Sequence, residues 1–419
     1  MQLKDSQQLH MQGSGSMEEK HERASVILRD AFMKNGGFFI KTGQLIASLD
    51  VIVPAIYRKN FEMMCHDCKE SSYEDVKYTI EHQLKMPIEK IFSQFEQKPV
   101  KSASIGQVHK AILKENNQPV AVKVMHKWLL EQSPGDVKLI KKFIDIGEYF
   151  FPEFQFQWFG EEVEKNLYQE LDFQREVQNG EKARQNLKGV KGITIPKNFT
   201  QYCSRSIIVM EWLNGIPIMD IQQLKSSGLD LKKISTEIST AFNKMIHIDG
   251  FCHADPHQGN FLVRFNEKNE TEVIILDHGL YVTLSEKTKV DYSRLWQGIL
   301  TQDPILMKKA ATDLGVQEDQ FQLLVSMVTS RKYSDVIDKE LDMKKRLDSP
   351  SDVEHRQELS KFGVLYSQQI CDILNKLNRE MLLLFKTKEF LRTIDNKLGL
   401  PINSFQITVI LTYIQFLQN

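Results

Sequence analysis

The run His253-Ala-Asp-Pro-His-Gln-Gly-Asn260 is polar, is rich in turn-forming residues and leads directly into an apolar segment from Phe261 to Phe265. A second apolar segment, from Val273 to Leu276, follows a polar turn and ends at Asp277-His-Gly-Leu280. Two apolar segments around a polar turn predict a β-hairpin. We therefore expect a loop, a hairpin and a second loop, with the hairpin returning Asp277 to the neighbourhood of Asn260.

This order of polar residues suits phosphoryl transfer from a nucleotide, which needs oxygen ligands for metal ions and a carboxylate beside the attacking group. In kinase catalytic loops an Asp orients the acceptor and an Asn five positions later binds Mg²⁺, which assigns these roles to Asp255 and Asn260. Asp277 matches the metal-binding Asp of an Asp-Phe-Gly motif, with His278 in place of Phe. The alternative is an ordinary loop with a structural histidine.

Residues earlier in the chain supply a lysine and further acids. Lys123 ends a strand-like segment that pairs, as a predicted hairpin, with the segment at 103–113. The pattern from 158 to 187 predicts one helix, on which Glu170 and Glu176 do not share a face. Glu176 is therefore expected to hold Lys123, while Glu170 and Asp172 reach another partner. Taken singly, these residues also fit an edge-strand lysine and a solvated helix face.

Composition excludes several functional classes. The chain has 419 residues, with 54 Lys and Arg against 55 Asp and Glu, so it lacks the basic excess of a general nucleic-acid binder. Its 5 cysteines are too few and too scattered for a disulfide framework. We interpret the Cys65-x-x-Cys68 pair as ordinary helical residues, because no second pair follows. No apolar run approaches the roughly 18 residues of a membrane-spanning helix.

Four segments are expected along the chain. They are a disordered tail at 1–22, a helical lead-in at 23–98, a small mixed α/β lobe at 99–213 and a mainly helical lobe with a helical tail at 214–419. In the lead-in, Ser71 and Glu74 predict a capping box. Pro87 predicts the first turn of a helix that reaches about Phe95.

In combination, the motifs resemble those of the UbiB (aarF-domain) family of atypical protein-kinase-like proteins. The resemblance covers residues 24–300 and rests on Lys41-Thr-Gly-Gln44, Ala103-Ser-Ile-Gly-Gln-Val-His109, Ala121-Val-Lys123, Glu170-Leu-Asp172, His253–Asn260 and Leu276–Leu280. It implies an α+β, two-lobed protein-kinase-like fold. The small N-lobe would be mixed, the C-lobe mainly helical, and a helical extension would precede them.

The resemblance also implies ATP and Mg²⁺ as cofactors. Lys123, Glu176 and Asp255 would be catalytic, and Asn260 and Asp277 would bind the metal. An alanine-type loop would replace the glycine-rich phosphate loop of protein kinases. The residues implied to bind the nucleotide, besides Lys123, are Ala103, Ser104, Gly106, Gln107, Lys41, Gln44, Glu170 and Asp172, with Lys41 and Gln44 facing Glu170 and Asp172.

The implied activity is phosphoryl transfer to a small molecule, or ATP hydrolysis, linked to mitochondrial lipid or ubiquinone homeostasis. The implied partners are a nucleotide, a lipid or quinone-like molecule and a membrane surface, with no nucleic acid. Kinase activity toward proteins is not expected, because no Ala-Pro-Glu segment follows Asp277 and the family's Lys-x-Gly-Gln helices cover the acceptor site. The alternatives are a nucleotide-gated binding protein and a scaffold without nucleotide. No targeting segment is evident in the sequence.

Overall fold

The computed structural model describes residues 16–47, 55–62, 70–150, 164, 168–254, 256–340 and 366–399. The chain forms two compact units: unit 1 contains Met1–His82, Glu96–His109 and Lys123–Leu171, and unit 2 contains Gln83–Phe95, Lys110–Val122 and Asp172–Asn419. Strands β3 (Gly106–Leu113) and β4 (Pro119–Met125) pass from one unit into the other. The domain boundaries expected at residues 98 and 213 stay predictions.

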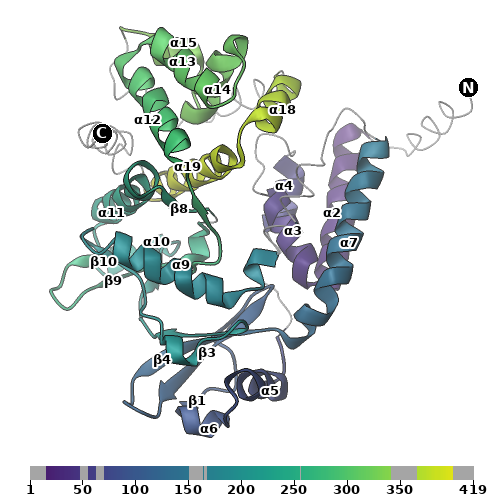
Figure 1. Ribbon diagram of the computed structural model, residues 1–419, viewed down its shortest axis with the longest axis vertical. Helices are drawn as coiled ribbons and strands as arrows, with labels where there is room; N and C mark the ends of the chain where they lie inside the picture. Colours follow the sequence, from purple (N-terminus) through teal and green to yellow (C-terminus); the bar gives the residue numbers. More distant parts are fainter. Residues whose placement is uncertain are drawn as a thin grey trace, which may run out of the picture. The chain divides into compact units, whose positions relative to one another are not determined.

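Unit 1 is built largely from four helices: α2 (Met17–Asn35), α3 (Gly37–Ala47), α4 (Ala55–Glu62) and α7 (Lys127–Phe150) (Figure 1). Ile40 and Phe61 form the buried centre, and the ring of Phe32 stacks on that of Phe61. Gly37 has φ +48°, and a Cβ there would lie 3.0 Å from the ring of Trp128. A glycine is therefore needed where the start of α3 meets α7.

The lead-in helices begin at other residues than the sequence pattern predicted. α2 begins at Met17 rather than near Arg23, because Ser16 and Glu19 form a capping box with hydrogen bonds of 3.3 and 2.9 Å. Ser72, and not Ser71, caps α5 (Tyr73–Leu84), where the Asp75 amide donates to its hydroxyl at 3.2 Å. Residues 1–15 of the expected disordered tail lie outside the described residues.

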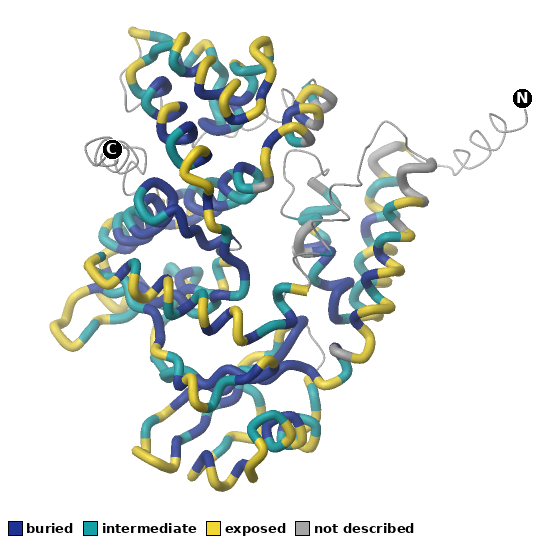
Figure 2. Tube along the Cα trace, viewed as in Figure 1, coloured by how far each residue is buried: buried dark blue, intermediate teal, exposed yellow. Residues whose placement is uncertain are grey.

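A five-stranded sheet confirms the hairpin predicted around Lys123. Its order is β1-β3-β4-β6, with β2 (Lys101–Ser102) also paired with β3, and β6 spans Ile207–Glu211. The valines at 120, 122 and 124 of β4 are buried. Much of this sheet is dark blue in Figure 2, the colour of buried residues. The helix expected to reach Phe95 ends early, as α6 (Ile88–Ile91), because β1 (Phe92–Phe95) pairs with β3 instead.

The long helix predicted from 158 to 187 is interrupted before α9 (Phe173–Asn186). Leu171 lies in a turn, and the Asp172 carboxylate caps α9 by accepting a hydrogen bond of 3.1 Å from the Gln174 amide. Glu170 precedes this cap and Glu176 follows it, so the expectation that both lie on one helix is wrong. Residues 151–163 and 165–167 lie outside the described residues.

Unit 2 contains a second sheet and a two-stranded ribbon. The sheet has the order β5 (Ile193–Thr194), β10 (Thr271–Ile275), β9 (Phe261–Phe265) and β7 (Ile216–Pro217), and the ribbon pairs β8 (Phe251–His253) with β11 (Tyr281–Thr283). β9 and β10 are antiparallel, with Phe261 opposite Ile275. The hairpin predicted at this position is therefore confirmed.

Helices form most of the remainder of unit 2, as the sequence predicted. They are α10 (Ile221–Ser226), α11 (Leu231–Lys244), α12 (Glu286–Thr301), α13 (Pro304–Asp313), α14 (Phe321–Thr329), α15 (Tyr333–Ile337), α18 (Ser367–Lys376) and α19 (Arg379–Lys397). Their shared core includes the buried rings of Phe242, Phe261, Tyr292 and Trp296. A π-helical turn, η3 (Met245–Asp249), extends α11 to the start of β8.

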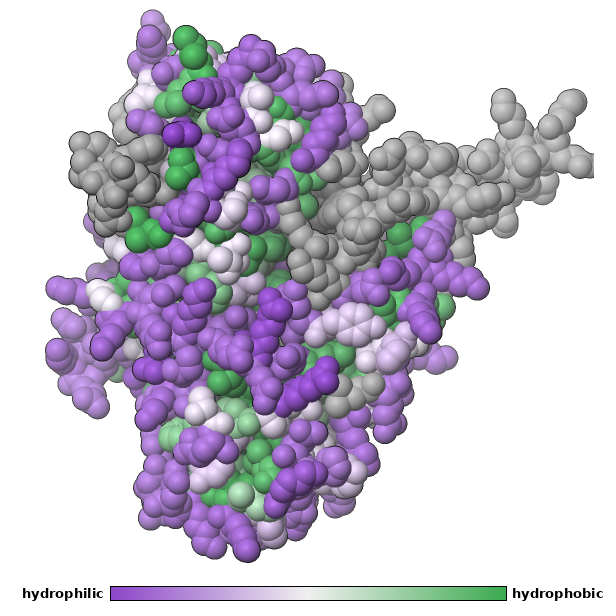
Figure 3. Space-filling model, in the orientation of Figure 1, coloured by the Kyte–Doolittle hydropathy of each residue, from purple (hydrophilic) through white to green (hydrophobic). Residues whose placement is uncertain are grey.

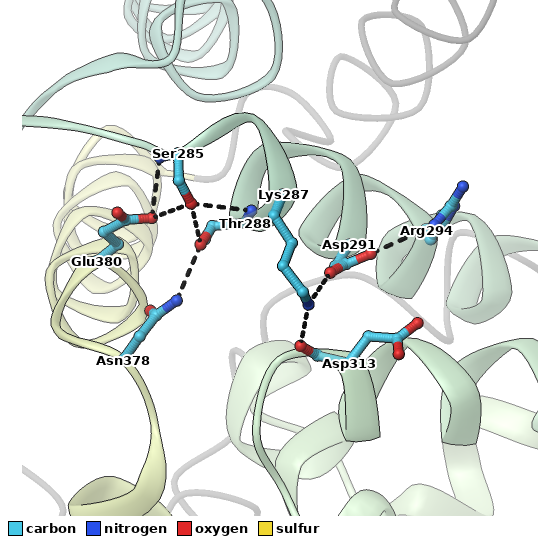
Figure 4. Close-up of polar contacts among 8 residues, drawn as sticks. All are labelled: Ser285, Lys287, Thr288, Asp291, Arg294, Asp313, Asn378 and Glu380. Carbon is cyan, nitrogen blue, oxygen red and sulfur yellow. Dashed lines mark hydrogen bonds and ion pairs between the residues drawn. The ribbon is translucent and has the colours of Figure 1, made fainter.

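The starts of α12 and α19 are joined by a polar cluster (Figure 4). Ser285 caps α12, and both its amide and its hydroxyl donate to the Glu380 carboxylate, at 3.1 and 3.2 Å. Asn378, which caps α19, donates to the Thr288 hydroxyl at 2.8 Å. Each helix therefore supplies a side chain that stabilises the first turn of the other.

The face of the molecule shown in Figure 3 is largely polar. On the face shown in Figure 3, hydrophilic side chains predominate, with small groups of apolar side chains between them. None of the helices in the described ranges is both long enough and apolar enough to span a bilayer.

Substitution of Gly192, with Gly228 as the control, would test how tightly α11 packs against the segment before β5. Gly192 has φ +72°, and a Cβ there would lie 1.9 Å from the Glu237 carboxylate, whereas Gly228 has φ +77° and open space around it. We expect Gly228→Ala to lower the free energy of unfolding by about 1–2 kcal/mol through backbone strain alone. Gly192→Ala should cost a further ~1–3 kcal/mol through overpacking, as measured by urea unfolding. Equal losses would contradict this reading.

Glu237 is a buried carboxylate on α11. Its side chain is 6% exposed, and neither carboxylate oxygen has a hydrogen-bond partner among the described residues. The ammonium of Lys233 lies 3.8 Å away and favours the charged form. Burial outweighs this attraction and raises the pKa of Glu237 to about 8.

A raised carboxyl pKa makes stability fall as the pH rises, because the folded state keeps a proton that the unfolded state has released. The free energy of unfolding should therefore decrease from about pH 4.5, the ordinary pKa of this group, to about pH 8. Glu237→Gln should flatten this slope and stabilise the protein at pH 8, as measured by urea unfolding at several pH values. Glu267→Gln, an exposed control in the β9–β10 turn, should keep the parental slope.

Candidate functional site

The β9–β10 hairpin brings the two predicted metal ligands to one end of the sheet. Asn260 ends a short 3₁₀ turn, η4 (Gln258–Asn260), and its carbonyl accepts a hydrogen bond of 2.9 Å from the Leu276 amide. Asp277 follows directly, and its carboxylate accepts from the Gly279 amide at 2.9 Å. The hairpin thus returns the chain as expected, with Asn260 beside the residue that precedes Asp277.

The loop before this hairpin is held at its flanks. The amide of Ala254 donates to the Leu280 carbonyl at 3.0 Å, and the Gly259 amide donates to His257 Nδ1 at 3.0 Å. His253 is fully buried and stacks on the ring of Tyr281, with centroids 4.9 Å apart, so it is a core residue. Asp255, the predicted catalytic residue, lies outside the described residues.

Helix α19 supports the strand that leads into this loop. The buried Thr387 hydroxyl shares its proton between two carbonyls, that of His253 at 3.1 Å and that of Leu383 in its own helix at 3.0 Å. Next to it, Lys388 donates to Asn243 at 3.1 Å and lies 4.7 Å from the ring centroid of Trp296. Burial lowers the pKa of Lys388 to about 7, although the Asp395 carboxylate opposes the shift.

Helix α9 packs its predicted catalytic acid onto the Asp277–Gly279 turn. Glu176 is 7% exposed, and one of its carboxylate oxygens lies 3.8 Å from the position of a Cβ on Gly279. Three residues further along the helix, Asn179 donates to the carbonyl of His278 at 3.0 Å. Lys123 belongs to unit 1 and Glu176 to unit 2, so their expected ion pair stays a prediction.

The loop at 103–107, which the resemblance identifies as the alanine-type loop, is held by hydrogen bonds to a histidine that follows β4. The His126 amide donates to the Ile105 carbonyl at 3.0 Å, and His126 Nε2 lies 2.9 Å from the Ala103 carbonyl oxygen. A Cβ on Gly106 would lie only 2.5 Å from the carbonyl oxygen of Val124. The close packing of β3 on β4, beside Lys123, therefore requires a glycine at position 106, and the contact of Gly106 with a nucleotide stays a prediction.

The side chain of Gln107 makes several hydrogen bonds within the protein. Its side chain is 1% exposed, accepts from the Ser71 amide at 2.7 Å and donates to the Ser71 carbonyl at 3.2 Å. The same amide nitrogen lies 2.9 Å from His109 Nε2. Burial lowers the pKa of His109, which favours a neutral ring that accepts this hydrogen bond. The Gln107 side chain is thus engaged within the protein, and its contact with a nucleotide stays a prediction.

The Lys-x-Gly-Gln motif lies on α3, and the expectation that its Lys41 faces Glu170 is confirmed. The Lys41 ammonium lies 3.1 Å from the Glu170 carboxylate, and the two side chains are 23% and 9% exposed. The carboxylate of Asp172 caps α9, and its contact with the nucleotide stays a prediction. The side chain of Gln44 lies outside the described residues.

The paired oxygen donors suit Mg²⁺ better than a transition metal. The side chains of Asn260 and Asp277 offer amide and carboxylate oxygens, the hard ligands that Mg²⁺ prefers. No cluster of three or more His, Cys, Asp or Glu that could hold a metal occurs in the described ranges. Mg²⁺ usually combines one or two protein carboxylates with phosphate oxygens and water, so the two residues fit this ion.

Sequence reasoning missed Thr387, His126 and the role of Ser71. Thr387 lies 134 residues beyond the carbonyl that it contacts, so no local pattern could reveal it. His126 directly follows a buried strand, and a polar residue at a strand end was the available signal. Ser71 was predicted as a helix cap, but its hydroxyl lies 2.7 Å from His126 Nδ1 instead.

Comparison with known proteins places this geometry among kinase-like proteins. Residues 63–311 match the ABC1 atypical kinase-like domain. The protein named AarF domain-containing protein kinase 1 from Gallus gallus is 34% identical over 379 residues, which are 90% of this chain and 72% of that protein. A Dictyostelium discoideum protein named probable serine/threonine-protein kinase abkD is 31% identical over 389 residues, 92% of this chain and 54% of that protein.

A solved structure shares the fold. The Mycobacterium tuberculosis protein Rv3197, in its complex with erythromycin, matches with a TM-score of 0.53 at 18% identity. The match covers 94% of this chain and 98% of that one. The expected α+β, kinase-like fold is thereby confirmed.

Thr387 offers a test of how α19 supports β8. Thr387→Val removes the donor to the His253 carbonyl and should lower the free energy of unfolding by about 1 kcal/mol. Hydrogen exchange should also become faster at residues 251–254, while Thr387→Ser should restore both properties. The control is Thr329→Val, because the hydroxyl of Thr329 donates to the Val325 carbonyl within its own helix, as that of Thr387 does to Leu383, and so accounts for the loss of the intrahelical bond. Faster exchange at 251–254 in this control would refute the assignment.

Proposed function

Since the chain belongs to the ABC1 atypical kinase-like family, we propose that it binds Mg-ATP and transfers a phosphoryl group to a small molecule or to water. Family membership confirms the resemblance inferred from the motifs. The observation that carries the proposal is the β9–β10 hairpin, which sets Asn260 beside Leu276 and Asp277. Oxygen donors brought together at the end of one hairpin support a metal-binding role of the kind that phosphoryl transfer requires.

Each predicted site residue has a role in this proposal. Lys123 binds phosphate oxygens, Glu176 holds the lysine, Asp255 orients the attacking group, and Asn260 with Asp277 holds Mg²⁺. The bound ion supplies positive charge that neutralises the phosphates. The nucleotide also meets the backbone at Ala103, Ser104, Gly106 and Gln107, and the groups that close over it come from Lys41, Gln44, Glu170 and Asp172.

The proposed acceptor is a small molecule or water rather than a protein. The ion pair between Lys41 and Glu170 supports this choice, because it ties α3 to the residues before α9 and fixes the lead-in helix. By family resemblance, the acceptor or ligand is lipid-like or quinone-like and the protein works in mitochondria beside a membrane surface. Imaging of the tagged chain with a mitochondrial marker tests the location.

Titration of Mg-ATP tests the central claim. The parent protein should gain about 2.7 kcal/mol of stability when ATP is at a hundred times its Kd. Asp277→Asn should abolish the part of this gain that requires Mg²⁺. Asp255→Asn should keep binding but lower phosphate release at least ~100-fold, with lipid or phenol-like compounds present as acceptors.

The matched control is Asp319→Asn, an exposed acid in η5 (Glu318–Gln320). It should behave like the parent in both assays. If Mg-ATP leaves the thermal stability of the parent unchanged, the proposed function is wrong. Unchanged turnover in Asp255→Asn would remove only the role given to Asp255.

A nucleotide-gated binding protein is the second candidate function. The contact that favours it is again the ion pair of Lys41 with Glu170. When a nucleotide binds, its phosphates can replace the Glu170 carboxylate as the partner of the Lys41 ammonium on α3. In this case ATP would change the affinity for lipid vesicles without being hydrolysed. Bound nucleotide recovered intact after long incubation, together with ATP-dependent vesicle binding, would favour this candidate over the enzyme.

A further inference from the structure

The histidine of the Asp277-His-Gly sequence is buried, and both its ring nitrogens face a hydrogen-bonding group. His278 is 5% exposed, its Nε2 lies 3.3 Å from the Ile275 carbonyl oxygen, and its Nδ1 lies 3.0 Å from the Tyr281 hydroxyl. A carbonyl can only accept, so Nε2 carries the proton and donates. In the neutral ring, the Tyr281 hydroxyl then donates to Nδ1.

Helix α9 is shaped to receive this ring. A Cβ on Gly180 would lie 3.2 Å from His278 Cδ2, so a larger residue would push the ring away. Asn179 also donates to the His278 carbonyl at 3.0 Å, and Glu176 lies one turn earlier, beside Gly279. The ring orientation of His278 is therefore coupled to the contact between α9 and the turn at Asp277.

Tyr281 connects the histidine to the β8–β11 ribbon. Its ring stacks on Phe251, with centroids 4.6 Å apart, and it pairs with His253 across the ribbon. The ammonium of Lys182, on α9, lies 4.1 Å from the ring centroid of Phe251. Tyr281 is thus fixed by packing, and its hydroxyl meets His278 from a rigid position.

We propose that Tyr281 is a positioning residue whose hydroxyl locks His278 and thereby holds the Asp277–Gly279 turn against α9. A phenylalanine in the position of His278 would be held by packing alone, whereas two directional hydrogen bonds allow the histidine one ring orientation. Because His278 and Asp277 are adjacent, the lock also fixes the direction of the Asp277 carboxylate. This inference rests on the metal-binding role proposed for Asp277.

Three variants separate positioning from simple packing: Tyr281→Phe, His278→Phe and the double variant. Tyr281→Phe leaves Nδ1 buried without its donor, so the unfolding equilibrium constant should rise about tenfold. The double variant removes both polar partners and should recover most of this loss, because replacing both partners of a buried hydrogen bond by apolar groups is nearly neutral.

The Mg²⁺ dependence of the ATP-induced thermal shift is a measurement that would not change if Tyr281 contributed only packing. The Mg²⁺ concentration that gives half of the ATP-induced thermal shift should rise about fivefold or more in Tyr281→Phe, in line with the loss of one hydrogen bond. It should stay raised in the double variant although stability has recovered, since neither phenylalanine can restore the directional bonds. A parental Mg²⁺ requirement in either variant would overturn the proposal.

Hydrogen exchange keeps the inference testable if the proposed function fails. Amides at 276–281 and in the first turns of α9 should exchange faster in Tyr281→Phe and in the double variant than in the parent. The control, Tyr333→Phe, removes a hydroxyl from a ring that packs edge-on against Phe321 in the helical part of unit 2, and it should leave this exchange unchanged. A parent without any Mg-ATP response would refute the function alone, whereas parental exchange in Tyr281→Phe would refute the lock.

Discussion

Antiparallel pairing of β9 with β10 is the constraint that organises unit 2 around its candidate site. The pairing sets Phe261 opposite Ile275, which leaves Asn260 and Leu276 hydrogen-bonded at the end of the ladder. β10 also pairs in parallel with β5, the short strand that follows Gly192 and the buried Glu237 contact. A shift of one residue in this register would turn every side chain of β10 to the opposite face and displace Asp277.

The cap at Asp172 determines which residues of α9 face the candidate site, as the register of β9 and β10 does for the hairpin. Because the helix begins there, residues 176, 179, 180 and 183 lie along one face, and the first three of them meet the Asp277–Gly279 turn. A shift of the sequence by one residue along this helix would rotate the face by about 100°. The observed cap gives the Asp172 carboxylate a structural role, and its contact with the nucleotide stays a prediction.

Local patterns in the sequence were sufficient for the hairpins, for the helical C-terminal part and for the order of the motifs, because these features depend on neighbouring residues. The pairing of Lys41 with Glu170 came from family resemblance, and the ion pair of 3.1 Å confirms it. The prediction that Ser71 caps α5 was wrong. Ser71 and Ser72 are adjacent and either could cap the helix, but Ser71 instead contacts Gln107 and His126, which leaves Ser72 as the cap. The close approach of Gly106 to β4 is equally invisible in a one-dimensional pattern.

The bond between Thr387 and the His253 carbonyl also has a consequence for biosynthesis. The two residues are 134 positions apart, and a ribosome adds about 5–20 residues per second. The β8 strand is therefore synthesised roughly 7 to 27 s before its partner on α19. During that interval the flank of the Asp255 loop lacks its final support, so the site is completed late in translation.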